Sequence, residues 1–331
     1  MIKIDLITGF LGSGKTTFIK KYARWLVDRG EYVGILENDL GAVNVDMMLL
    51  QDIMGERCEL EMVSGGCDRE THRRRFRTKL IAMGMSGYDR VVVEPSGIFD
   101  VDEFFDALRE EPLDRWYEIG SVIAVVDAGL PRELSKTADY MLASEAASAG
   151  CILLSRSQKA SGEEIRDTVA HLNRALEGIG CGRRLRPDEE IFCRNWEEFT
   201  EEDFEWLASC GYVAEDYVKQ SFDCEPAFDS LFFMYVHLEP EQLRRAAEGL
   251  LADTDCGKIF RIKGFLRDRE GTCAENDAEN GAGKESWLEL NATRRETELR
   301  PVRAGQEIVI VIGEGLNKEK IETYLQGGEK G

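Results

Sequence analysis

The first half of the chain alternates between short apolar runs and longer segments with helical periodicity. The apolar runs have the length of strands and cover residues 3–8, 32–36, 90–93, 122–126 and 151–154. Helical patterns fill the intervals at 18–28, 72–83, 102–110, 132–148 and 163–177. The uninterrupted Val91-Val-Val run is typical of a parallel strand that is buried on both faces. Repeated strand–helix units of this kind predict an α/β fold, with a parallel sheet and helices on both faces.

The pattern changes in the second half of the chain. A helical segment near 201–209 lies in a mixed stretch, and from residue 228 the order becomes strand, helix, strand, strand, strand, helix. The strands are expected at 231–237, 258–265, 286–291 and 307–312, and the helices at 239–251 and 317–325. We therefore expect one domain over 1–215 and a smaller α+β domain over 225–331. Residues 267–285 lack apolar periodicity, which predicts a long mobile hairpin loop in the second domain.

Composition narrows the class of protein. The 331 residues include 63 acidic and 42 basic side chains, a net charge of −21, which disfavours nucleic acid as the main partner. No apolar run approaches the ~18 residues of a membrane helix, and the N-terminus resembles a strand rather than a signal peptide. The nine cysteines are scattered, without a Cys-x-x-Cys pair, as expected for reduced thiols. We expect a cytoplasmic protein with neither a nucleic-acid nor a membrane partner.

A phosphate-binding loop follows the first predicted strand. Gly9-Phe-Leu-Gly12-Ser13-Gly14-Lys15-Thr16 fits the pattern G-x-x-x-x-G-K-[S/T], and a predicted helix comes after it. The glycines let backbone amides wrap a phosphate, and the helix N-terminus adds its positive dipole end. Lys15 can reach the β- and γ-phosphates, the Thr16 hydroxyl can ligate Mg²⁺, and Thr17 can contact the α-phosphate. The loop predicts Mg²⁺-dependent binding of a nucleoside triphosphate.

Two further predicted strands end in acidic residues, where ligands of a parallel sheet bind. Glu94 follows the 90–93 strand and could hold Mg²⁺ through water, while the Gly97 amide could meet the γ-phosphate. Asp39 follows the 32–36 strand and could touch Mg²⁺ or orient the attacking water. We therefore predict Lys15, Asp39 and Glu94 as the catalytic residues.

Five segments together resemble the CobW-type family of P-loop GTPases, which is related to the nickel-enzyme maturation GTPases. They are Gly9–Thr17, Glu37-Asn-Asp-Leu-Gly41, Glu94-Pro-Ser-Gly97, Val125-Val-Asp127-Ala128 and Ile259-Phe-Arg261-Ile-Lys263-Gly264-Phe265. The resemblance spans nearly the whole chain and implies a P-loop GTPase domain followed by a CobW-like C-terminal domain. It also implies GTP hydrolysis with Mg²⁺, coupled to delivery of a metal or to activation of a client metalloenzyme or corrinoid protein. A homodimer is compatible with the resemblance to this family.

The first departure from the family pattern is in its Gly-Cys-x-Cys-Cys metal motif. This chain has Gly65-Gly66-Cys67-Asp68-Arg69-Glu70, which keeps only Cys67. With Cys58 and His72, Cys67 could form a site for Zn²⁺, Co²⁺ or Ni²⁺, since thiolate and imidazole suit these ions. We favour the interpretation that Cys58 is a core thiol and that His72 belongs to a basic helix. For Cys67, both a metal-binding role and a structural role stay open.

The second departure is in the base-reading motif, Asn-Lys-x-Asp in GTPases, where this chain has Ser155-Arg156-Ser157-Gln158. Arg156 can stack on a base as Lys would, and Ser155 is a small polar residue in place of Asn. Gln158 replaces Asp and can accept a hydrogen bond from the base with only one neutral oxygen. Loss of a charged, bidentate acceptor would cost on the order of 1.5–3 kcal/mol, or ~10- to 100-fold in guanine selectivity. GTP is expected as the substrate, and ATP stays open.

Two other function classes stay open. A nucleotide-gated module could bind a partner without handling metal, and a small-molecule kinase shares the phosphate loop. The Gly97 that follows Glu94 favours a γ-phosphate switch over a kinase. Of the remaining histidines, His171 lies in a polar helical stretch and is expected to be exposed, and His237 is expected on a strand.

Overall fold

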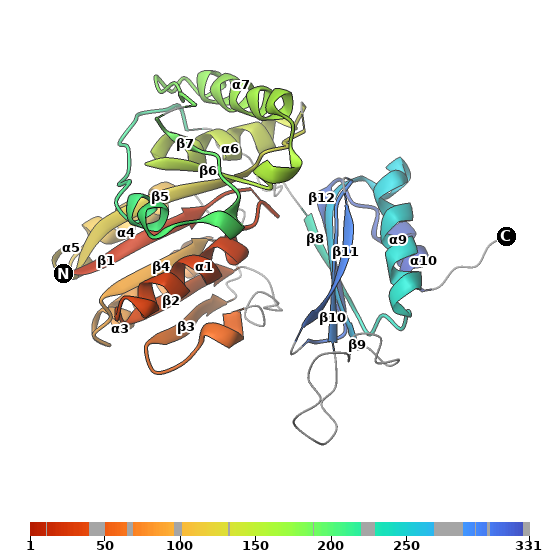
Figure 1. Cartoon of the computed structure of the whole chain (residues 1–331), viewed down its shortest axis with the longest axis horizontal. Coiled ribbons are helices and arrows are strands. Elements are labelled where there is room, and N and C mark those ends of the chain that lie inside the picture. The colour runs from red at the N-terminus through yellow and green to blue at the C-terminus, as the bar shows by residue number, and fades with distance from the viewer. Residues whose placement is uncertain are drawn as a thin grey trace. The chain divides into compact units, whose positions relative to one another are not determined.

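The computed structural model describes residues 1–331 except for 11, 40–49, 65–68, 96–100, 132, 188, 220–228, 268–286, 295, 303–304 and 327–331. The chain divides into two compact units, Met1–Glu225 and Pro226–Gly331 (Figure 1). The loop expected at 267–285 lies almost wholly outside the described residues. None of the described helices is long and apolar enough to cross a membrane.

The first unit is built on a parallel sheet. Within the described residues its seven strands take the order β3-β2-β4-β1-β5-β6-β7. Their bounds are β1 Ile2–Thr8, β2 Val33–Asp39, β3 Cys58–Ser64, β4 Arg90–Pro95, β5 Tyr117–Asp127, β6 Cys151–Ser155 and β7 Ile191–Phe192. Every pairing is parallel, so the carboxyl ends of the strands share one edge of the sheet. The predicted α/β fold is confirmed.

Helices cover both faces of this sheet (Figure 1). They are α1 Lys15–Asp28, α3 Arg69–Gly84, α4 Val101–Arg109, α5 Leu113–Trp116, α6 Lys136–Ser148, α7 Gly162–Gly178 and α8 Glu201–Leu207, with a short 3₁₀ turn η1 at Gln51–Ile53. Successive residues of a strand point to opposite faces, and β1 places Leu6 in one core and Ile7 in the other. The Leu6 core includes Phe104 of α4, and the Ile7 core includes Phe18 of α1.

A buried polar cluster links β1, β4 and β5. Asp5 of β1 is fully buried and accepts from Arg90 Nη1 at 2.7 Å, from Tyr22 OH at 2.8 Å and from the Ser121 amide at 2.7 Å. Arg90 also donates to Glu31 at 3.1 Å. Both oxygens of the Asp5 carboxylate are therefore satisfied, which is what makes its burial tolerable.

His171 of α7 is buried rather than exposed, so that prediction is wrong. Its Nε2 lies 2.7 Å from Asp139 Oδ1, and its Nδ1 lies 3.1 Å from the Pro131 carbonyl oxygen. The neighbouring Leu172 belongs to the core under α7, and these two polar partners let His171 share that inner face. The polar composition of α7 hid this arrangement.

The second unit is an antiparallel sheet with two helices, as expected for an α+β unit. In the described part of the chain its order is β11-β10-β9-β12-β8. The bounds are β8 Asp229–Met234, α9 Pro240–Ala252, η4 Thr254–Cys256, β9 Lys258–Arg267, β10 Trp287–Ala292, β11 Thr297–Val302, β12 Ile308–Glu314 and α10 Lys318–Leu325. Leu243 of α9 and Ile321 of α10 share a core with Ile262 and Val311 of the central strands. His237 lies beyond the end of β8, so its placement on a strand is wrong.

Candidate nucleotide-binding site

The phosphate loop joins β1 to α1 with glycines in conformations that other residues rarely adopt. Gly9, Gly12 and Gly14 have φ angles of 142°, 81° and 109°. A Cβ atom on Gly9 would lie 2.2 Å from the Val125 carbonyl oxygen, so a side chain cannot be accommodated there. The glycines bring the backbone close to β5 and turn it directly into the N-terminus of α1. That turn is the concave backbone geometry that binds phosphate.

Polar side chains converge on this turn. Lys15 is buried and its Nζ donates to the Gly9 carbonyl oxygen at 2.9 Å, so its ammonium lies against the loop. Ser13 is buried too, and its hydroxyl has no hydrogen-bond partner among the described residues. Thr17 is exposed at the beginning of α1. A cation and an orphaned hydroxyl beside backbone amides suit an anionic ligand.

Thr16, at the beginning of α1, meets Glu94, near the end of β4. The Thr16 hydroxyl donates to Glu94 Oε1 at 3.1 Å, and both side chains are buried. The parallel pairing of β1 with β4 matches Leu6 with Val93, which sets Glu94 beside the last residues of β1. A hydroxyl and a carboxylate are hard oxygen ligands, so the pair fits a Mg²⁺ ion held directly or through water.

Three predicted site residues fall wholly or partly outside the described residues. Asp39 is the last residue of β2, next to β4, but its side chain is not described. Gly97 and Cys67 lie in the undescribed stretches 96–100 and 65–68. Their roles stay predictions.

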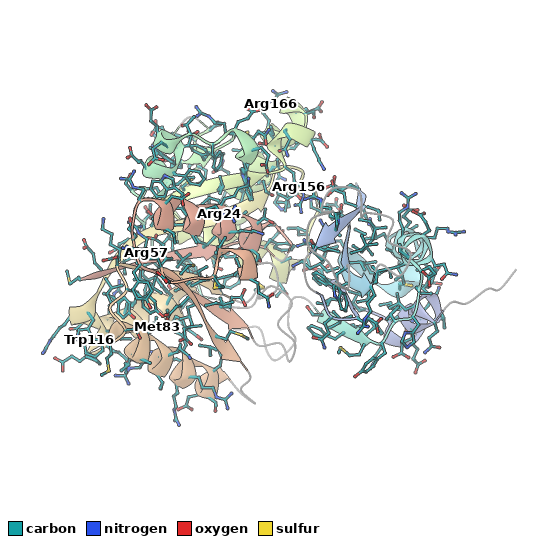
Figure 2. All side chains as sticks on the ribbon, turned by 60° about the horizontal axis from the view of Figure 1, so that its bottom comes forward. Arg24, Arg57, Met83, Trp116, Arg156 and Arg166 are labelled. Carbon is teal, nitrogen blue, oxygen red and sulfur yellow. The ribbon has the colours of Figure 1, made fainter. Side chains whose placement is uncertain are left out.

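The predicted base-reading residues follow β6. Arg156 (labelled in Figure 2) has a left-handed φ of 55° and donates to Asp127 Oδ2 at 2.6 Å and to the Gly12 carbonyl oxygen at 3.2 Å. Ser155 is buried, and its hydroxyl has no partner among the described residues. Gln158 is exposed in η2, Ser157–Lys159. The structure therefore joins Ser155 and Arg156 to the phosphate loop and leaves Gln158 open to solvent.

Trp196 is a site residue that the sequence did not indicate. It begins the 3₁₀ turn η3, Trp196–Glu198, and its Nε1 donates to the Leu154 carbonyl oxygen at 3.0 Å. A Cβ atom on Gly14 would lie 3.3 Å from the edge of the indole ring, so the ring packs directly on the phosphate loop. The strand before it, β7, has two residues, too few for an apolar pattern to reveal.

Glu145 is the second residue that sequence reasoning missed. It lies on α6, is 5% exposed, and its Oε2 has no hydrogen-bond partner among the described residues. Burial raises the pKa of Glu145 to about 7, against the opposing effect of the nearby Lys15 ammonium. A carboxyl group that titrates near neutrality therefore lies behind the phosphate loop.

The part of the chain that the structure describes holds no assembled site for a transition metal. No group of three or more His, Cys, Asp or Glu side chains in the described residues could hold one. Cys58 is 2% exposed within the core under α1, and burial raises its pKa to about 11. A thiol this reluctant to ionise suits the core position that we favoured for it.

A parallel sheet with this loop after its first strand defines a P-loop nucleotide-binding protein. The family model for the nucleotide-binding domain of CobW/HypB/UreG matches residues 3–179, more than half of the chain. This chain belongs to that family, as the sequence motifs indicated.

The chain is also similar to curated relatives and to a solved structure. The chain is 27% identical over 164 residues to zinc chaperone YeiR of Escherichia coli K12, covering 49% of each chain. It is 30% identical over 137 residues to zinc chaperone YjiA of the same organism, covering 38% of this chain and 41% of YjiA. The chain thus matches about half the length of these curated relatives. The crystal structure of Zn(II)-bound YjiA GTPase from E. coli aligns over 99% of both chains, with 21% identity and a TM-score of 0.32.

Proposed function

We propose that this chain binds a nucleoside triphosphate with Mg²⁺, GTP by preference, and hydrolyses it to drive the handling of a metal ion. The contact between Thr16 and Glu94, beside a glycine loop that ends in Lys15, supports this most directly. It brings together two hard oxygen ligands, which would hold the Mg²⁺ ion that accompanies a bound triphosphate. The cation would neutralise charge on the transferring phosphoryl group.

Each loop residue then has a distinct task. The amides of Gly12, Ser13 and Gly14 bind phosphate oxygens, and Lys15 leaves the Gly9 carbonyl to meet the β- and γ-phosphates. Thr16 and Glu94 would hold Mg²⁺, Glu94 through water. Asp39 and Gly97 would sense the γ-phosphate from strand ends on the same edge. Thr17 would contact the α-phosphate.

The base would bind beyond β6. Arg156 is fixed by Asp127 and the Gly12 carbonyl, so its guanidinium can flank a base without further ordering. Ser155 and Gln158 supply neutral polar groups in place of the usual Asn and Asp. Because Gln158 cannot offer a charged bidentate acceptor, we propose that GTP is favoured over ATP by a narrower margin than in GTPases with that Asp.

The metal role rests on family membership and on relatives that are named zinc chaperones. Zn²⁺, with Co²⁺ and Ni²⁺ as competitors, would bind near Cys67 and pass to a client metalloprotein. Nucleotide state would set whether the segment around Cys67 holds or releases the ion, because Asp39 ends β2, which pairs with β3, the strand that precedes this segment in the chain.

Calorimetry on metal-free protein tests this proposal. GTP and ATP analogues are titrated with Mg²⁺, and the titrations are repeated after addition of Zn²⁺, Co²⁺ or Ni²⁺. Tighter GTP than ATP binding, with metal binding lost in Cys67→Ser and retained in Cys193→Ser, is expected. Equal ATP binding with no metal binding would remove the metal role and leave a triphosphatase that switches a protein partner. Transfer of phosphate to an added metabolite would instead indicate a kinase.

A further inference from the structure

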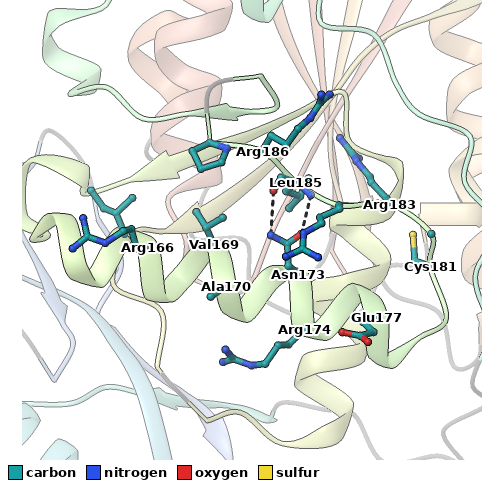
Figure 3. A pocket seen from close by; sticks show the side chains of 14 residues that line it. Arg166, Val169, Ala170, Asn173, Arg174, Glu177, Cys181, Arg183, Leu185 and Arg186 are labelled. Carbon is teal, nitrogen blue, oxygen red and sulfur yellow. Dashed lines mark hydrogen bonds between the residues drawn. The ribbon is translucent and has the colours of Figure 1, made fainter.

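A groove on the first unit runs between α7 and the segment 181–187, and no residue of the phosphate loop is among those that line it. Its volume is about 750 Å³, and Figure 3 shows its lining side chains. Among the described residues that line it are five arginines and one glutamate, Glu177. Such a concentration of positive charge is unexpected in a chain whose net charge is −21.

The walls of the groove are fixed by hydrogen bonds. The Asn173 side chain donates to the Leu185 carbonyl oxygen at 3.1 Å and accepts from the Leu185 amide at 2.8 Å (Figure 3). Arg183 donates to the carbonyl oxygens of Ala146 and Ala147 at 2.7 and 3.2 Å, and burial lowers its pKa. The segment is thus clamped to α7 on one side and to α6 on the other, so the groove is preformed.

Most of the positive charge in the groove is not neutralised. Arg186 pairs with Glu190 at 2.9 Å and with Glu189. Arg166, Arg174 and Arg184 are exposed, and none forms an ion pair with a residue that the structure describes. Figure 2 shows Arg166 on the outside of this unit, where a partner can reach it.

The spacing of the arginines suits an extended ligand. Arg166 and Arg174 are eight residues apart on α7, which corresponds to about 12 Å along the helix axis. An extended peptide covers the same distance in about four residues, so one strand could contact both arginines along its length. Buried Val169 and Leu185 give the groove an apolar floor between the charges.

We propose that this groove binds an extended acidic segment of a partner protein, with carboxylates about four residues apart and apolar side chains between them. Guanidinium groups form paired hydrogen bonds with carboxylates, and the apolar floor adds contact area. Such a segment would reach the chain without occupying the nucleotide site, because the groove shares no lining residue with the phosphate loop.

Fluorescence anisotropy tests the proposal on the full chain with Mg²⁺ and saturating GTP analogue present. The probe is a labelled twelve-residue peptide with Glu at every fourth position and Leu or Ala between. The groove variant is Arg166→Glu/Arg174→Glu, and the matched control is Arg244→Glu/Arg245→Glu on the exposed face of α9. Both doubles change the net charge by the same amount. Circular dichroism establishes that each variant is folded, and Arg166→Gln/Arg174→Gln provides a milder second pair.

We expect the wild type to bind the peptide, with an affinity that falls as salt rises. The affinity should weaken at least ~10-fold in the groove variant and hardly change in the control. A peptide with Gln in place of Glu should bind weakly. Equal weakening in both double variants, or in neither, would overturn the proposal. So would competition by millimolar inorganic phosphate, which would indicate a simple anion site, or tighter binding of a twelve-nucleotide single strand than of the peptide.

Discussion

The Thr16 hydroxyl lies 3.1 Å from Glu94 Oε1, although 78 residues separate them in the chain. The sheet order brings them together, because β4 is the direct neighbour of β1 and runs parallel to it. One residue comes from the beginning of a helix and the other from the end of a strand. The pair therefore depends on the whole sheet rather than on any local motif.

Substitution of Glu94 tests its role beside the cation. Glu94→Gln keeps the size of the side chain but removes its charge, so Mg²⁺ should be held less well. We expect GTP turnover to fall about 100-fold, while binding of GTP without Mg²⁺ changes little. Phosphate release across a range of Mg²⁺ concentrations measures this. Glu118→Gln, on an exposed position of β5, is the control and should leave turnover unchanged; an equal effect of both would count against the assignment.

Base selectivity should respond to Gln158. Gln158→Asp restores a charged, bidentate acceptor, so the ratio of GTP to ATP affinity should rise ~10- to 100-fold. Competition between labelled GTP and unlabelled ATP provides the measurement. Gln326→Asp, exposed at the end of α10, carries the same change in charge and should leave the ratio as it is. An unchanged ratio in Gln158→Asp would place the base elsewhere.

Stability should depend strongly on Asp5. Asp5→Ala removes the main partner of buried Arg90 and leaves the Ser121 amide and Tyr22 hydroxyl without their acceptor. We expect the free energy of unfolding to fall by about 3–5 kcal/mol. Urea denaturation measures the change, and Asp28→Ala, exposed at the end of α1, should alter stability by less than about 0.5 kcal/mol. A loss below 1 kcal/mol for Asp5→Ala would show that the cluster contributes little.

The pKa of Glu145 predicts a particular dependence of stability on pH. Its pKa is about 7 in the folded chain, above its ordinary value of 4.5, because burial disfavours the carboxylate. Between these values the folded state binds more protons at Glu145 than the unfolded state does, so stability falls as the pH rises. Above pH 7 the accumulated loss is about 3 kcal/mol.

Glu145→Gln should lack this loss. Between pH 4.5 and pH 8, the free energy of unfolding of the wild type should fall by about 3 kcal/mol relative to that of Glu145→Gln. Denaturation curves at a series of pH values give the comparison. Glu202→Gln, exposed on α8, should follow the wild type at every pH. Parallel curves for Glu145→Gln and the wild type would contradict the raised pKa.

The sequence was most informative where one segment determines its own structure. Apolar runs and helical periodicity located β1, β4, β6 and α1, and the glycine pattern located the phosphate loop. Short or polar elements left no such pattern. β7 has two residues, and β11 carries Glu298, Arg300 and Pro301 on an edge of its sheet.

Tertiary contacts explain the site residues that the sequence did not reveal. Trp196 packs near Gly14 only because η3 follows the edge strand β7. Glu145 comes within the electrostatic influence of Lys15 only because α6 packs on the sheet. The sequence indicated Asp127 only as part of a family motif. Its ion pair with Arg156 forms because β5 and β6 are neighbours in the sheet. His171 was misplaced for the same reason, since its partner Asp139 belongs to another helix.

The central claim is that Lys15 and its loop hold a triphosphate for Mg²⁺-dependent hydrolysis. The most direct measurement is phosphate release from GTP, with and without Mg²⁺, by the wild type, Lys15→Ala and the exposed control Lys318→Ala. The account predicts slow, Mg²⁺-dependent turnover by the wild type and the control, and a loss of at least ~100-fold in turnover with loss of GTP binding in Lys15→Ala. Wild-type affinity and turnover in Lys15→Ala would contradict it.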